Sequence, residues 1–200
     1  MESSLVRIKQ GYIKFREKYA AGDTSVMQEL SCHGQKPKIM IIGCSDSRVD
    51  PSLIFQCDPG ELFMLRNVAN IIPPYEKDAG YHGTSAALEY GVCYLNVEHL
   101  IILGHSQCGG IDALKNNESL HQNDFISKWV SIINDNQSHG SVDSLSKHAI
   151  TQSHKNAMSF PWIKERIEKK QLALHRWFFD IKSAELSHYS SKDDCYIPII

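Results

Sequence analysis

The chain has 200 residues, 42% of them hydrophobic and 22% charged, with a formal net charge of −2. This is an ordinary globular composition, and the length fits one domain with a real core. The near-neutral charge argues against nucleic acid or an anionic membrane as the main partner, because both usually demand a basic surface. No apolar run approaches the roughly 18–20 residues of a membrane span. The first residues also lack the apolar core of a secretion signal, so we expect a cytoplasmic protein.

The first third of the chain predicts a helical arm followed by a buried strand. Apolar residues spaced by three or four predict an amphipathic helix over 3–19, and a second short helix is expected over 24–30. We therefore divide a single domain, 1–200, into an arm over 1–31 and a core over 38–200. Three short continuous apolar runs predict strands buried on both faces, as in a parallel sheet. They are 38–43, 62–65 and 100–104.

The remaining elements complete an α/β fold with a mainly parallel central sheet flanked by helices. A helix over 83–96 is apolar on most sides and is expected to be buried against the sheet. Two more polar helices are expected over 120–135 and 142–157, and Pro161 opens another that extends to about residue 170. Strands over 172–179 and 184–189 predict a hairpin at the sheet edge.

Two groups of potential metal ligands follow two of the predicted strands. Cys44 ends the first strand, and His105 and Cys108 follow the third. Sites in α/β sheets form beyond the carboxyl ends of strands, so these three side chains converge if the strands are neighbours. Two thiolates and one imidazole suit Zn²⁺ and leave a fourth position for water. The alternative is a redox-active or buried cysteine beside an incidental histidine.

Asp46 and Arg48 lie close behind the first of these ligands. An aspartate two residues after a ligand cysteine can reach the metal or its water, and the arginine fork can pair with that aspartate. The alternative interpretation is a surface ion pair of little energetic value.

These segments closely resemble the β-class carbonic anhydrases. The resemblance rests first on Cys44-Ser45-Asp46-Ser47-Arg48 and on His105-Ser106-Gln107-Cys108-Gly109-Gly110, and it extends over most of the chain. Further matching segments are Pro59-Gly60-Glu61, Arg66-Asn67-Val68-Ala69-Asn70, Pro73-Pro74, Ala86-Ala87-Leu88-Glu89-Tyr90 and Trp177-Phe178-Phe179-Asp180.

The resemblance implies a zinc ion held by Cys44, His105 and Cys108. It implies reversible hydration of CO₂ to bicarbonate and a proton, by attack of zinc-bound hydroxide. Asp46 would accept a hydrogen bond from that hydroxide and orient it, and Arg48 would hold Asp46 off the metal. The family also shows a closed state in which Asp46 is the fourth ligand, and both states stay open for this chain.

The resemblance also implies a substrate pocket and the plant-type subgroup, whose members usually adopt the open form. Gln35 stands nine positions before Cys44, where plant-type members have a glutamine that binds substrate. Ile41 replaces the tryptophan of bicarbonate-regulated members, which argues against an allosteric bicarbonate site. The apolar wall for CO₂ would be Phe63, Val68 and Tyr90, each of which is also a good core residue. Gly109 would open a helix whose N–H groups face bicarbonate.

Family members build this pocket across a dimer interface, so the resemblance implies a homodimer or a dimer of dimers. The apolar stripe of the arm needs a surface to cover, which fits such an assembly.

Three other functions compete with this one. A family relative could hydrolyse another small cumulated substrate such as carbon disulfide. A bicarbonate sensor or structural-zinc scaffold would predict loss of the Asp46–Arg48 pair, which is present. A nucleotide-binding protein would need a Gly-x-Gly-x-x-Gly turn after the first strand, which is absent.

The remaining cysteines and histidines match no expected ligand position. Cys32, Cys57, Cys93 and Cys195 are interpreted as packed or idle. His82 could relay protons, but an exposed loop histidine is the simpler interpretation.

Overall fold

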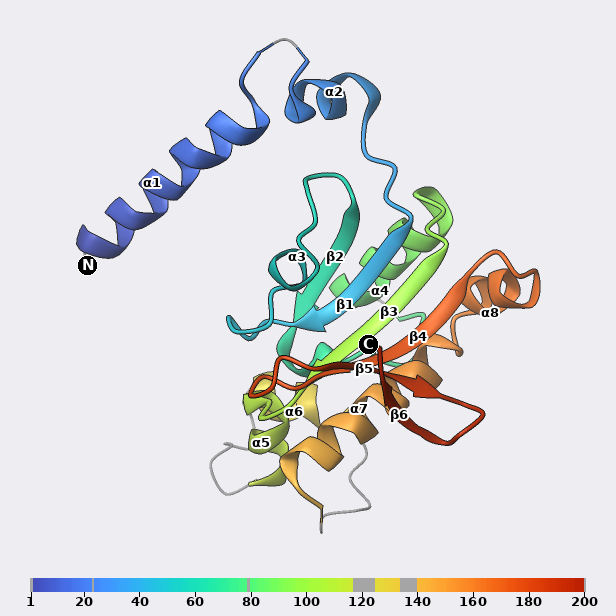
Figure 1. The fold of residues 1–200 in the computed structure, drawn as a ribbon. Helices are drawn as coiled ribbons and strands as arrows, with labels where there is room; N and C mark the ends of the chain where they lie inside the picture. The colour runs from blue at the N-terminus through green and yellow to red at the C-terminus, as the bar shows by residue number, and fades with distance from the viewer. Residues whose placement is uncertain (1, 23, 79, 117–124, 134–139, 200) are drawn as a thin grey trace.

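The computed structural model describes residues 2–22, 24–78, 80–116, 125–133 and 140–199. Figure 1 shows that they form a central sheet with helices packed along it and a helical arm that projects away from it. The sheet has six strands in the order β2-β1-β3-β4-β5-β6. The strands are β1 (Ile39–Cys44), β2 (Leu62–Asn67), β3 (His99–His105), β4 (Ala173–Phe179), β5 (Leu186–Ser190) and β6 (Cys195–Pro198).

The first four strands are parallel, and β5 and β6 add antiparallel strands at one edge. The predicted α/β fold with a mainly parallel sheet is therefore confirmed, as is the β4–β5 hairpin. The carboxyl ends of β1 and β3 are neighbours, because these two strands pair directly. This pairing is what positions the candidate site.

Eight α-helices and two short turns of other helical types are present among the described residues. The helices are α1 (Glu2–Tyr19), α2 (Val26–His33), α3 (Pro51–Ile54), α4 (Gly83–Glu89), α5 (Gly109–Lys115), α6 (Phe125–Val130), α7 (Val142–Ala157) and α8 (Pro161–Glu168). A 3₁₀ turn, η1 (Val68–Asn70), follows β2, and a π-helical turn, η2 (Tyr90–Tyr94), follows α4. Within the described ranges, no helix combines the length and the apolar character needed to cross a membrane.

The sheet is buried on both faces near its centre, which explains the continuous apolar runs. On one face, Met40 and Ile42 of β1 pack with Leu88 and with Ile150 of α7 in the largest core cluster. On the other face, Ile41 packs in a smaller cluster with Ile101 and Leu103 of β3 and with partly buried aromatic side chains. Alternate side chains of one strand therefore enter two different apolar layers.

Local signals account for several helix boundaries. The Ser141 hydroxyl accepts a hydrogen bond from the Ser144 N–H at 3.1 Å and caps α7, whose predicted bounds are confirmed. Pro161 occupies the first turn of α8, where its missing N–H costs nothing. Ser25 caps α2, so this helix begins two residues later than predicted and continues to His33.

Several other predictions needed correction. The helix predicted over 83–96 is α-helical only to Glu89, where η2 widens the turn. The helix predicted over 120–135 is described only as α6, and 117–124 and 134–139 lie outside the described residues. The strand β6 was not predicted, because Pro198 and the shortness of the segment disguise an edge strand.

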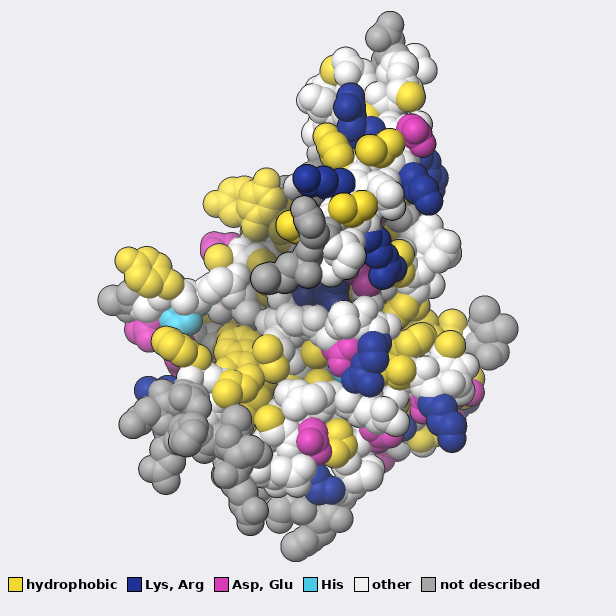
Figure 2. Space-filling view, turned by 90° about the vertical axis from the view of Figure 1, so that its left-hand side faces the viewer, with side chains coloured by type: hydrophobic (Ala, Val, Ile, Leu, Met, Phe, Trp, Pro, Cys, Tyr) yellow, Lys and Arg dark blue, Asp and Glu magenta, His cyan; other side chains and the backbone are white. Residues whose placement is uncertain are grey.

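The arm differs from the rest of the molecule in its exposure. Leu5, Ile8 and Tyr12 of α1 are 63%, 71% and 61% exposed, although they form the predicted apolar stripe. In Figure 2 the arm projects from the body and carries hydrophobic side chains among basic ones. The helix is therefore formed as predicted, but its apolar face lies uncovered on this chain.

Candidate metal centre

The carboxyl ends of β1 and β3 bring together the three side chains whose convergence the sequence predicted. The ligand atoms of Cys44, His105 and Cys108 all lie within 4.8 Å of one another. The two sulfur atoms are 3.9 Å apart. The three residues are 5%, 1% and 1% exposed, so the cluster is almost closed to bulk water. Cys44 lies close to His105 and Cys108 because β1 pairs directly with β3, although the two strands are far apart in the sequence.

The loop from His105 to Cys108 is held by the end of β4. The Ser106 N–H donates to the Phe179 carbonyl at 3.0 Å, and the Ile181 N–H donates to the Ser106 hydroxyl at 2.9 Å. Cys108 occupies the position immediately before the first residue of α5, and its side chain makes no capping hydrogen bond. The two bonds at Ser106 fix the backbone that carries His105 and Cys108.

One observation shows that this cluster fits a metal ion. The His105 Nδ1 lies 2.8 Å from the Ser106 carbonyl and donates its proton to it, which leaves Nε2 with a free lone pair. That Nε2 is buried and has no hydrogen-bond partner among the described residues. Buried polar atoms rarely lack partners, so an unpaired nitrogen beside two sulfur atoms fits a thiophilic cation such as Zn²⁺.

The two thiols share a hydrogen bond and shift each other's pKa in opposite directions. The hydrogen bond from the Cys108 thiol lowers the pKa of Cys44 to about 4. The same bond and the neighbouring Cys44 thiolate raise the pKa of Cys108. The first proton therefore leaves easily, and the second leaves only when a cation neutralises the adjacent negative charges.

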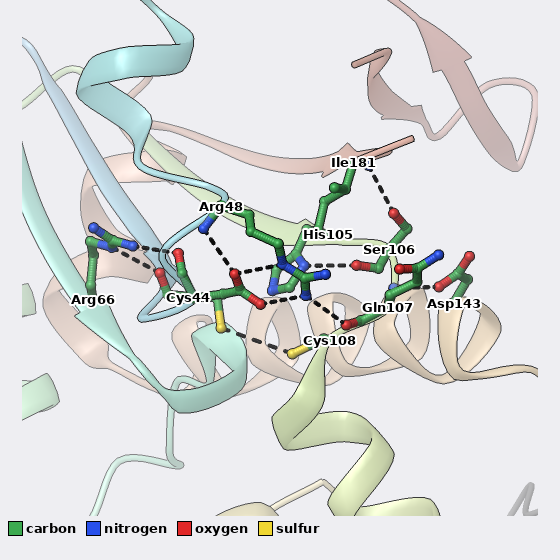
Figure 3. A network of polar contacts seen from close by, with 10 residues as sticks. Cys44, Arg48, Arg66, His105, Ser106, Gln107, Cys108, Asp143 and Ile181 are labelled. Atoms are coloured by element: carbon green, nitrogen blue, oxygen red, sulfur yellow. Dashed lines mark hydrogen bonds and ion pairs between the residues drawn. The ribbon is translucent and has the colours of Figure 1, made fainter. Parts of the chain in front are cut away.

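Asp46 and Arg48 form a two-pronged ion pair in the loop that follows Cys44, and Figure 3 shows the Arg48 side chain beside the cluster. The Arg48 Nε donates to Asp46 Oδ1 at 3.0 Å, and its Nη2 donates to Asp46 Oδ2 at 2.7 Å. The Arg48 N–H also donates to Asp46 Oδ1 at 2.9 Å. These Arg48 bonds hold the pKa of Asp46 well below its usual range. Asp46 is thus a permanent anion turned toward Arg48, and its oxygens are not among the clustered ligand atoms.

Arg66 supports this loop from β2. Its Nε donates to the Cys44 carbonyl at 2.8 Å, and its Nη2 donates to the Asp46 carbonyl at 2.7 Å. Its Nη1 reaches Asp50 Oδ2 at 2.6 Å. Sequence reasoning found Arg66 only as a matching residue, because a loop-bracing role depends on β1–β2 pairing.

Two predicted pocket residues lie next to the cluster. Gly109 is the first residue of α5 and directly follows Cys108. Val68 is 37% exposed in η1, and a Cβ added to Gly110 would lie 2.5 Å from its Cγ1. The Trp129 indole N–H donates to the Val68 carbonyl at 2.8 Å. Val68 is therefore held between α5 and α6, beside the loop from His105 to Cys108, which we call the metal loop.

Three other predicted pocket residues lie toward the opposite end of the sheet. Gln35 is exposed in the connection that enters β1 at its amino end, whereas Cys44 stands at the carboxyl end. Phe63 pairs in register with Met40, four residues or about 13 Å along the strand from Cys44. The ring of Phe63 lies 5.7 Å from that of Tyr90. The structure thus separates these three residues from the cluster of their own chain.

The remaining cysteines and His82 stay outside the cluster. Cys32, Cys93 and Cys195 are exposed, and Cys57 is partly buried. All six cysteines are described, and none forms a disulfide. His82 Nε2 lies 2.5 Å from Asp78 Oδ1, in an ion pair ahead of α4.

Comparison with known proteins agrees with this geometry. The carbonic anhydrase family model matches residues 39–186. A carbonic anhydrase of Synechocystis sp. is 37% identical over 92% of this chain and 70% of its own. The β-carbonic anhydrase 3 of Arabidopsis thaliana is 34% identical over 87% of this chain and 72% of its own.

Solved structures give the same result. The β-carbonic anhydrase CcaA matches with a TM-score of 0.88 and 34% identity, over 99% of this chain and 93% of that one. One of two tetrameric β-carbonic anhydrases from Sordaria macrospora matches with a TM-score of 0.75 and 26% identity, over 98% of each chain.

Proposed function

Since the chain belongs to the β-carbonic anhydrase family and its activity is the reversible hydration of CO₂, we propose that it works with one Zn²⁺ held by Cys44, His105 and Cys108. The single observation that supports this ligand set most strongly is the buried, unpartnered Nε2 of His105 beside two sulfur atoms. Zinc, when bound, lowers the pKa of water in its open coordination position toward neutrality.

Asp46 supplies the hydrogen-bond acceptor that orients the nucleophile. Its carboxylate stays charged because Arg48 bonds it twice, so it accepts an O–H at any working pH. The same bonds hold Asp46 away from the ligand set, which corresponds to the open state. If this pair were broken, Asp46 would be free to serve as a further ligand to a bound ion, which would correspond to the closed state.

The substrate pocket is completed by a second copy of the chain. Val68 and Gly109 line it from the chain that provides the ligands. Gln35, Phe63 and Tyr90 lie toward the other end of their own sheet, so they line the pocket of a partner. The uncovered apolar stripe of α1 supports a homodimer or a dimer of dimers, with 1–31 as an arm on a single core domain over 38–200.

The proposed location is the cytoplasm. Six free cysteines suit a reducing compartment, where thiols persist without forming disulfides.

Metal analysis combined with stopped-flow CO₂ hydration tests the zinc proposal. Purified protein should hold about one zinc per chain, lose activity with a strong chelator and regain it with Zn²⁺. Full activity in metal-free protein would refute the ligand set. Measuring carbon disulfide hydrolysis on the same preparation distinguishes CO₂ hydration from the related hydrolase activity.

A further inference from the structure

Asp143 lies in the first turn of α7 and bonds directly to the metal loop. Its Oδ1 accepts the Gln107 N–H at 2.7 Å, although the two residues are 36 positions apart. Figure 3 shows Asp143 reaching Gln107 from the side opposite Arg66. Asp143 touches none of the three clustered ligand atoms, so any effect on the site must pass through the loop.

The bond is made to a backbone in an uncommon conformation. Gln107 has φ +54°, a left-handed geometry that a non-glycine residue keeps only when its surroundings enforce it. On one side Ser106 is fixed to β4, and on the other Cys108 immediately precedes α5. Asp143 is the side chain that bonds the N–H of the residue between them.

The backbone of Gln107, whose N–H and carbonyl belong to successive peptide groups, links this constraint to the ion pair. The Gln107 carbonyl accepts a hydrogen bond from Arg48 Nη2 at 3.2 Å. The same Nη2 donates to Asp46 Oδ2 at 2.7 Å. One guanidinium nitrogen therefore bridges the loop that Asp143 anchors and the carboxylate that Arg48 restrains.

We propose that Asp143 is a positioning residue which, through the Gln107 backbone, holds Arg48 against Asp46 and so keeps Asp46 out of the open coordination position. The inference rests on the proposed roles of Asp46 and Arg48. Without the Asp143 carboxylate, Gln107 relaxes from its left-handed conformation, Arg48 loses an acceptor, and Asp46 is released toward the metal.

A matched control variant distinguishes the proposed positioning role of Asp143 from a purely structural role in α7. An acidic residue in a first helical turn also stabilises the helix through its dipole. Ser141→Ala removes the cap of the same helix start but none of the bonds to Gln107. If Asp143 merely stabilised α7, the two variants would behave alike.

The test compares Asp143→Ala, Asp143→Asn and Ser141→Ala, each loaded with zinc and separately with cobalt(II). Asp143→Ala should lower kcat about tenfold, the value of one hydrogen bond to a charged group, with KM and zinc content little changed. Its cobalt(II) visible spectrum should shift, because a carboxylate replaces water on the metal. Asp143→Asn, which keeps an acceptor oxygen, should show a smaller change in the same direction, and Ser141→Ala should match the wild type.

A double-mutant cycle with Asp46→Asn completes the test. In the Asp46→Asn background, Asp143→Ala should cause no further loss and no spectral shift, because the released group is already gone. An equal loss in both backgrounds, a wild-type spectrum for Asp143→Ala, or the same behaviour in Ser141→Ala would overturn the proposal. If Asp143→Ala does not fold, the same cycle is run with Asp143→Asn. A wild type without metal or CO₂ hydration would refute the proposed function instead.

Discussion

The candidate metal centre and the N-terminal arm differ in how far contacts within one chain fix them. At the metal centre, backbone and side-chain bonds from β2, β4 and α7 fix each loop within one chain. In the arm, α1 is a formed helix most of whose large apolar side chains are exposed, from 39% for Phe15 to 71% for Ile8. The difference teaches that a single chain organises the clustered ligand residues, whereas in the proposed assembly the substrate pocket and the arm depend on a second copy.

The largest expected effect comes from replacing a cysteine of the ligand cluster, compared with replacing a cysteine outside it. Cys108→Ser should lose most of its zinc and reduce CO₂ hydration more than about a thousandfold, since changes that only perturb a ligand's neighbours already cost about 10–100-fold. Metal analysis and stopped-flow kinetics check it. Cys195→Ser, at an exposed cysteine of β6, is the matched control, and equal behaviour of the two variants would disprove the ligand assignment.

A second substitution separates metal binding from catalysis at the same centre. Asp46→Asn should keep zinc but lower kcat about a hundredfold, the lower end for a positioned proton acceptor. Zinc content and stopped-flow rates are measured on one preparation. A variant as fast as the wild type would remove Asp46 from the mechanism.

The arm is tested by placing a charge on its apolar stripe. Ile8→Glu should leave the metal centre intact but shift the protein to smaller species, with activity falling about tenfold as partner wall residues are lost. Light scattering after size exclusion and zinc content give the two readouts. Gln10→Glu adds the same charge at a polar position of α1 and should change neither, while an unaltered oligomer in Ile8→Glu would contradict the assignment of the arm to an interface.

The smallest expected effect concerns packing beside the site. Gly110→Ala places a methyl group 2.5 Å from Val68 Cγ1, so Val68 must move, at a cost of about 1–3 kcal/mol in unfolding free energy. Gly109→Ala is the control, because a Cβ there meets nothing within 4 Å. Thermal melts and KM for CO₂ measure the change, and equal stability of the two variants would show that the contact is not tight.

The features that the sequence predicts best are those where residue chemistry and hydrophobic periodicity coincide. Cys44 and His105 end two apolar runs, and parallel strands place their carboxyl ends together, so the cluster could be anticipated. Gln107 and Asp143 could not, because their bond depends on how α7 docks against the β3 loop. The only local signal was an acidic residue in the first turn of the predicted helix over 142–157.

The sequence by itself determined the α/β class, the ligand types and the amphipathic arm, because these follow from residue chemistry and from periods of two and 3.6 residues. The tertiary structure alone decided that Arg66 bonds the Cys44 and Asp46 carbonyls, that Gln107 takes a left-handed conformation, and that Gln35 lies at the other end of β1 from Cys44. The physical reason is that side-chain direction and long-range hydrogen bonds depend on packing between elements far apart in the chain.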